Sequence, residues 1–79
     1  MQINNIIHTK YDSITLGRKV DVIEVGYKIN VVDRFIVIRT AEFYSFLLNK
    51  YDSYTDYFET IPFEQQCNDI KEFLNYINK

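Results

Sequence analysis

The stretch that most constrains the fold is residues 20–40, in which apolar and polar side chains alternate. One side of the alternation holds residues spaced two apart, namely Ile23, Val25, Tyr27, Ile29 and Val31. A period of two is typical of a strand with one buried face. Residues 35–39 are again β-branched and aromatic, which favours a strand. The stretch therefore predicts two long antiparallel strands joined by a hairpin.

The turn of this hairpin is placed by matching the apolar faces of the two strands. A two-residue loop at Asp33-Arg34 sets Val31 opposite Ile36, so that the apolar faces coincide. The same register brings Lys28 and Arg39 together on the outer face of the sheet. Neither loop residue is glycine, although the usual hairpin turn needs a positive φ at both positions.

The residues before this stretch are less regular. Ile3, Ile6 and Ile7 have the spacing of a helical stripe, but asparagines at positions 4 and 5 disfavour a helix interior. Residues 1–11 are therefore either a short helix or a strand. Residues 13–16 predict a short strand, and a loop at residues 17–19 leads into the long strand. Three successive strands predict an antiparallel meander.

The residues after the hairpin predict helices. Residues 41–51 carry aromatic and leucine side chains at helical spacing. Residues 53–59 predict a short helical turn or an irregular segment, and Pro62 suits the first turn of a last helix. The predicted fold class is α+β, with a three-stranded antiparallel meander covered on one face by two or three helices. Residues 1–79 are predicted to form a single compact domain.

Composition excludes several classes of protein. The 79 residues are enough for one modest core, and the ordinary apolar and charged fractions argue against disorder. A lone cysteine, Cys67, excludes an internal disulfide framework and fits a reducing compartment. No apolar run approaches the roughly 18 residues of a membrane span, and no signal peptide opens the chain. We expect a cytoplasmic protein without a membrane partner.

Few residues have catalytic or metal-binding character. His8 is the only histidine, and Asp12 four residues later is its nearest candidate partner, but two ligands do not make a metal site. Cys67 falls on the apolar stripe of the last helix, where a thiol is usually a small core residue. Gly17 and Gly26 are isolated, so no glycine-rich phosphate loop is present. The sequence predicts no enzyme, no metal and no cofactor.

Residues 51–59, here called the acidic-aromatic segment, are the most distinctive candidate contact surface. Tyrosine suits interfaces because it tolerates both apolar and polar surroundings. In a helix, the carboxylates at positions 52, 56 and 59 would share one face, where they could compete with phosphate for Lys and Arg groups of a nucleic-acid-handling partner. A solvated segment with packed tyrosines is the plainer interpretation. The predicted partner-binding residues are Tyr51, Asp52, Tyr54, Asp56, Tyr57 and Glu59.

Two functional hypotheses follow. The first is a small non-enzymatic protein-binding module, of the kind that a phage or mobile element uses to inhibit a host protein by occupying its surface. The alternative is a small nucleic-acid-binding regulator, because basic residues beside an exposed aromatic on a sheet face are typical of single-strand binders. Residues 1–41 carry a charge of +2 and residues 42–79 carry −4, and the acidic whole argues against this alternative. The residues predicted for it are Lys28, Arg39, Phe35 and Arg18.

Overall fold

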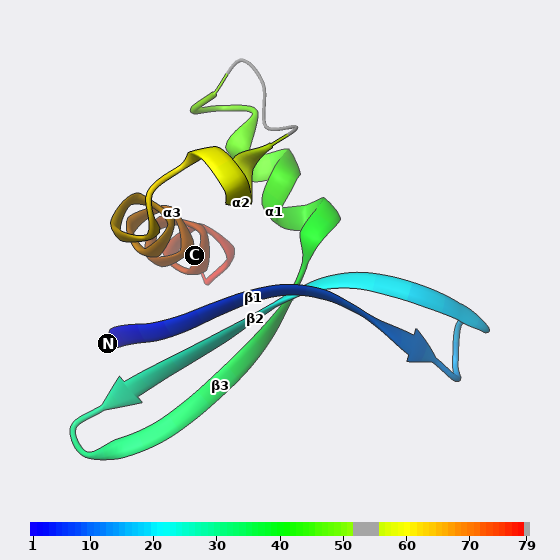
Figure 1. Ribbon diagram of the computed structural model, residues 1–79, viewed down its shortest axis with the longest axis horizontal. Coiled ribbons are helices and arrows are strands. Elements are labelled where there is room, and N and C mark those ends of the chain that lie inside the picture. Colours follow the sequence, from blue (N-terminus) through cyan, green and yellow to red (C-terminus); the bar gives the residue numbers. More distant parts are fainter. Residues whose placement is uncertain (52–55, 79) are drawn as a thin grey trace. The chain divides into compact units, whose positions relative to one another are not determined.

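The computed structural model describes residues 1–51 and 56–78. In these ranges three strands are followed by three helices, which confirms the α+β class and the antiparallel meander (Figure 1). The elements are β1 (Gln2–Ser13), β2 (Arg18–Ile29), β3 (Val32–Arg39), α1 (Thr40–Leu47), α2 (Tyr57–Thr60) and α3 (Phe63–Ile77). The chain divides into two compact units, residues 1–42 and residues 43–79. That the whole chain is one domain stays a prediction.

The first strand is longer than the sequence predicts. β1 pairs with β2 from Ser13 opposite Arg18 to Gln2 opposite Lys28, so residues 2–11 are strand and not helix. The prediction of a short strand at residues 13–16 is wrong, because residues 14–17 form the turn. Gly17 has a φ of 66° there, in the left-handed region that glycine adopts at no steric cost.

A bulge explains why the start of β1 resembles a helix in sequence. The register shifts between Ile3 and Asn5, so one residue is inserted into the strand at this point. Ile3 lies opposite Tyr27 and Ile6 lies opposite Val25, which puts both isoleucines on one face of the sheet although they are three residues apart. A helical spacing thus arises from a bulged strand.

The β2–β3 turn lies three residues earlier than predicted. It is formed by Asn30 and Val31, and Asn30 has a φ of 58°. Asparagine is one of the few residues that tolerate this conformation. Val25 consequently lies opposite Ile36, and the apolar faces of the two strands still coincide.

The turn position separates two residues that were predicted to meet. Lys28 lies opposite Asp33, and its Nζ is 3.6 Å from the Asp33 Oδ1. Arg39 lies opposite Val22, six residues away along β2. The predicted contact of Lys28 with Arg39 is therefore wrong.

Burial distinguishes the two faces of the sheet. One face, here called the inner face, carries the buried side chains of Ile3, Ile23, Val25 and Ile38. The opposite face, here called the outer face, carries the even-numbered residues of β2 together with the odd-numbered residues of β3. Val22 is buried on the outer face.

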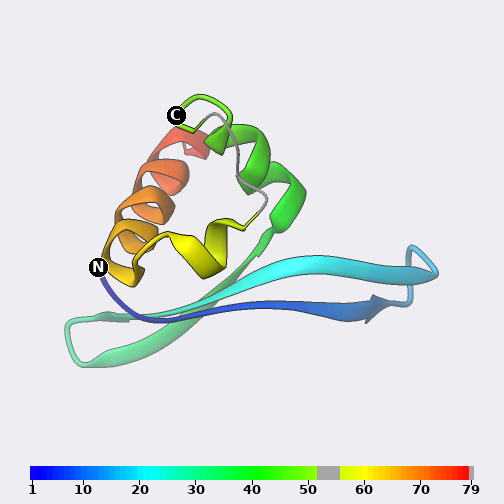
Figure 2. The ribbon, with the colours of Figure 1, turned by 45° about the horizontal axis from the view of Figure 1, so that its top comes forward.

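Aromatic side chains form the core of residues 43–79. The Phe43 ring meets the rings of Tyr57 and Phe73 edge to face, at centroid distances of 5.6 and 5.5 Å. These three residues come from α1, α2 and α3, so the three helices of this unit share one core (Figure 2). Leu47 and Ile70 complete it as fully buried side chains. No helix in residues 1–51 or 56–78 is long and apolar enough to cross a membrane.

Candidate functional site

Exposed apolar side chains gather on the outer face of the sheet. Ile7 and Val37 lie on either side of Glu24, so they are separated by two strand spacings, roughly 10 Å. Phe35 precedes Val37 by two residues on the same edge strand. The exposed fractions are 73% for Phe35, 49% for Val37 and 43% for Ile7. We call these three residues the apolar centre.

The four residues predicted for nucleic-acid binding also lie on the outer face. Arg18 and Lys28 occupy even positions of β2, while Phe35 and Arg39 occupy odd positions of β3, and the register places these two sets on one face. Lys28 lies ten residues from Arg18 along β2, a separation of roughly 33 Å. Lys28 is therefore remote from the two arginines, and it faces Asp33 instead.

Arg18 and Arg39 share a hollow of about 280 Å³, here called the basic notch. It exists because β3 pairs with β2 only as far as Arg39 opposite Val22, so that β2 continues beside β1 alone (Figure 1). The residues that line it all belong to the unit of residues 1–42. They are Leu16, Arg18, Lys19, Val20, Asp21, Arg39 and Ala41.

Asp21, the acidic residue that lines the basic notch, contacts two neighbouring side chains. The Asp21 Oδ1 atom accepts a hydrogen bond of 2.7 Å from the Thr40 hydroxyl and lies 2.6 Å from the His8 Nε2. Burial raises the pKa of Asp21, but the contacts with Thr40 and His8 outweigh it and lower the pKa. His8 is thus paired with Asp21, and the pairing with Asp12 considered from the sequence is wrong. Antiparallel pairing brings the strand of Asp21 beside that of His8, whereas Asp12 lies opposite Lys19.

This cluster does not have the order of a catalytic triad. In a triad the hydroxyl bonds to the histidine, which takes its proton, and the carboxylate orients the histidine. Here the Thr40 hydroxyl donates to the carboxylate itself. Among residues 1–51 and 56–78 there is also no group of three or more His, Cys, Asp and Glu side chains that could hold a metal ion.

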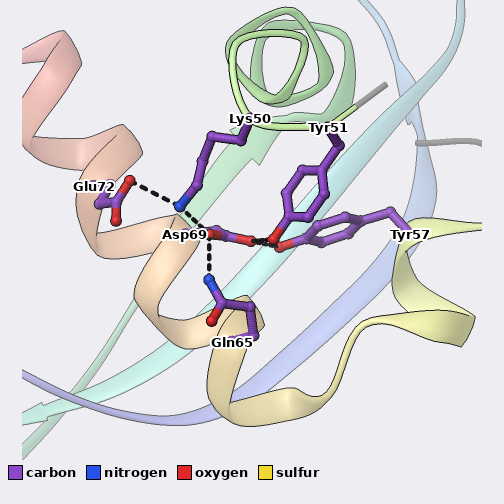
Figure 3. Close-up of polar contacts among 6 residues, drawn as sticks. All are labelled: Lys50, Tyr51, Tyr57, Gln65, Asp69 and Glu72. Carbon is purple, nitrogen blue, oxygen red and sulfur yellow. Dashed lines mark hydrogen bonds and ion pairs between the residues drawn. The ribbon is translucent and has the colours of Figure 1, made fainter. Parts of the chain in front are cut away.

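A buried carboxylate organises the helical unit (Figure 3). Asp69 of α3 is fully buried, and each of its oxygens accepts two hydrogen bonds. The Oδ1 atom accepts from Lys50 Nζ at 2.6 Å and from Gln65 Nε2 at 2.9 Å. The Oδ2 atom accepts from the hydroxyls of Tyr57 at 2.6 Å and Tyr51 at 2.8 Å.

The donors around Asp69 decide its charge. Burial raises the pKa of Asp69, but the hydrogen bonds from Lys50, Tyr57 and Tyr51 together lower it below its ordinary value. Burial and the adjacent carboxylate raise the pKa of Tyr57, which therefore stays a proton donor. A buried charge with a full set of donors satisfies the condition under which burial is tolerated. Asp69 thus joins the segment before α2, α2 itself and α3.

The Asp69 cluster changes the interpretation of the acidic-aromatic segment. Tyr57 is 2% exposed, so its prediction as a partner-binding residue is wrong, because its hydroxyl and ring belong to the core. Tyr51 is half-buried and donates to Asp69. Asp56 and Glu59 are exposed. Asp52 and Tyr54 lie outside the described residues.

The Asp69 cluster was not predicted from the sequence. The predicted apolar stripe of the last helix ran through Phe63, Cys67, Ile70, Phe73 or Leu74, and Ile77. Ile70 and Phe73 are buried in α3 as predicted, whereas the buried polar residues Gln66 and Asp69 were not expected. Phe63 and Ile77 are about half exposed. The available signal was the number of tyrosines, since buried tyrosine hydroxyls need acceptors.

Comparison with protein-family models, with curated proteins and with solved structures finds no match for this chain.

Proposed function

We propose that the protein is a non-enzymatic protein-binding module whose contact surface is the apolar centre of the outer face. The observation that carries this proposal is the exposure of Phe35, which is the most exposed aromatic among the described residues. Interfaces combine an apolar middle, enriched in aromatic residues, with a polar rim. Ile7 and Val37 extend the apolar middle on either side of Glu24, and Arg39 follows Val37 by two residues as a polar neighbour at its edge.

Phe35 is large enough to act as the anchor of an interface. A phenylalanine buries about 150–250 Å² when a partner covers it, and such anchors dominate binding energy. Among the described residues of the acidic-aromatic segment none is an equivalent anchor, because Tyr57 is already used in the core and Tyr51 and Phe58 are half-buried. Its exposed carboxylates, Asp56 and Glu59, supply charge alone. A module of this kind acts by occupying its partner's surface, which is the mode of action we propose for an inhibitor.

Affinity capture with paired variants tests this proposal. The tagged parent and the variants Phe35→Glu and Val37→Glu are incubated with a lysate of the source cells. We expect one protein to be retained by the parent and lost from both variants, by about tenfold or more. Ile14→Glu is the matched control, because Ile14 is an apolar residue that is 98% exposed in the β1–β2 turn. Equal retention by all four proteins would contradict the proposal.

A second candidate function is binding of single-stranded nucleic acid. It is favoured by the position of Phe35 on the same face as Arg18 and Arg39. Two or three phosphate contacts predict that affinity falls roughly 7- to 20-fold between about 50 and 200 mM salt. Fluorescence anisotropy with a labelled oligonucleotide measures this fall. Arg39→Gln should weaken oligonucleotide binding and spare protein capture, whereas the uncharged substitution Val37→Ala should weaken protein capture and spare oligonucleotide binding.

A further inference from the structure

We infer that the basic notch is a binding site for a phosphate monoester, the group that ends a nucleotide or a nucleic-acid strand. The proposal concerns a ligand and residues different from those of the apolar centre. It starts from a cavity in which Arg18, Lys19 and Arg39 converge on one hollow of about 280 Å³.

The basic residues that line the notch outnumber its acidic residue, and they form no ion pair among the described residues. No ion pair joins Arg18, Lys19 or Arg39 to a carboxylate in residues 1–51 or 56–78. Asp21 is the acidic residue of the lining, and its Oδ1 already contacts Thr40 and His8. Three cations against one carboxylate leave the hollow with an excess of positive charge, which attracts an anion.

The side chains of the notch suit phosphate in particular. A guanidinium presents its N–H groups as a planar fork that matches two oxygens of one phosphate, and two arginines line the notch. Lys19 adds a compact charge. A phosphate monoester carries nearly two negative charges and three free oxygens, so it can satisfy several of these donors at once.

The remaining lining residues limit what the phosphate is attached to. Leu16, Val20 and Ala41 give the notch apolar walls, which strengthen electrostatic attraction by displacing water. Its volume of about 280 Å³ lies just below the usual range of about 300–1,000 Å³ for small-molecule pockets. The notch therefore has room for a phosphate and the adjoining part of the molecule that carries it, and recognises the end of its ligand.

Nuclear magnetic resonance titration tests the inference. Inorganic phosphate and adenosine 5′-monophosphate are added to the labelled protein at constant ionic strength, with chloride and adenosine as the matched controls. We expect saturable shifts confined to the amides of residues 16–21 and 39–41 with the two phosphate-bearing probes and no such shifts with the controls. Equal shifts with chloride would overturn the inference, as would shifts spread over the whole sheet.

Variants and oligonucleotides sharpen the same test. Arg18→Gln and Arg39→Gln should each weaken phosphate binding by about tenfold, whereas Lys28→Gln, a cation at the far end of the same face, should leave it unchanged. If Lys28→Gln weakens binding as much as the arginine variants, attraction is non-specific and the inference fails.

A 5′-phosphorylated oligonucleotide that binds more tightly than its 5′-hydroxyl counterpart identifies a strand end as the source of the phosphate. Tight binding of both oligonucleotides without binding of the monophosphate would overturn the inference. Phe35→Glu separates the two proposals, because it should abolish protein capture and leave phosphate binding intact.

Discussion

Replacing Asp69 by asparagine should lower the free energy of unfolding by about 2–4 kcal/mol. Asparagine keeps the shape of the side chain but has one acceptor oxygen where the carboxylate has two. One pair of donors, either Lys50 and Gln65 or Tyr51 and Tyr57, must then face an amide NH₂ group. A hydrogen bond to a charged group contributes about 1.5–3 kcal/mol, so losing two costs about 3–6 kcal/mol before any relaxation of the donors reduces the loss. Lys50 offsets part of the loss, because it keeps its 2.9 Å contact with Glu72.

The change is measured by urea unfolding followed by far-ultraviolet circular dichroism. In a chain of this size the same loss lowers the melting temperature by roughly 10–30 °C. Asp56→Asn is the matched control, because Asp56 is exposed and its side chain makes no capping hydrogen bond at α2. This control should stay within about 0.5 kcal/mol of the parent.

A double-mutant cycle identifies the hydrogen bonds responsible. Tyr57→Phe removes one donor and should cost about 1.5–3 kcal/mol in the parent, but clearly less in the Asp69→Asn protein. Additive effects of the two substitutions would show that the tyrosine and the carboxylate are not coupled. If Asp69→Asn itself changes stability by less than about 0.5 kcal/mol, the account of Asp69 as the organising group is refuted.

Three further predictions concern the pH dependence, the turn and the core. The pKa of Asp69 is lower in the folded chain than in the unfolded chain. The ionised carboxylate therefore stabilises the fold fully at a pH above its pKa in the unfolded chain, and this stabilisation is lost as the pH falls through its pKa in the folded chain. Chemical unfolding between about pH 5 and pH 2 should therefore show a steeper loss of stability for the parent than for Asp69→Asn. Asn30→Ala should cost about 1–2 kcal/mol and Asn30→Gly much less, because the φ of 58° disfavours a Cβ atom, and thermal melts of the two variants measure the difference. Phe73→Ala should cost about 3–5 kcal/mol in urea unfolding, since this buried ring meets Phe43 and Phe46 edge to face, whereas Tyr76→Ala at an exposed site of the same helix should cost much less.

The alternating pattern of residues 20–40 predicted the pairing of faces correctly but could not place the turn. Any shift of the register by an even number of residues keeps the apolar faces together, and the predicted and observed registers differ by such a shift. The deciding feature is the left-handed conformation of Asn30, and a lone asparagine is a weak signal in sequence. The three-residue error moved Arg39 six positions along β2, from beside Lys28 to opposite Val22.

The displacement of Arg39 along β2 determines which features of the outer face could be predicted from the sequence. Lys28, Phe35 and Arg39 were assigned to the outer face from their positions alone, and the structure places them there. Arg18 was predicted in a loop near this face, whereas it is the first residue of β2. The grouping of Arg18 with Arg39 could not be predicted, because it depends on where β3 stops pairing with β2. The Asp69 cluster was equally inaccessible, since Lys50 and Tyr51 reach Asp69 across 19 and 18 residues of sequence. A periodic pattern in the sequence indicates which residues share a face of one helix or strand, so it cannot predict contacts between residues this far apart in the chain.

Site-specific photo-cross-linking tests the central claim most directly. A photoreactive amino acid is placed at position 37 in the apolar centre or at position 56 in the acidic-aromatic segment, where the natural side chains are both exposed. Irradiation in a lysate of the source cells is followed by mass spectrometry of the adducts. Our account predicts one cross-linked protein from position 37 and none from position 56, whereas an adduct from position 56 alone would contradict it and assign the contact to the acidic-aromatic segment.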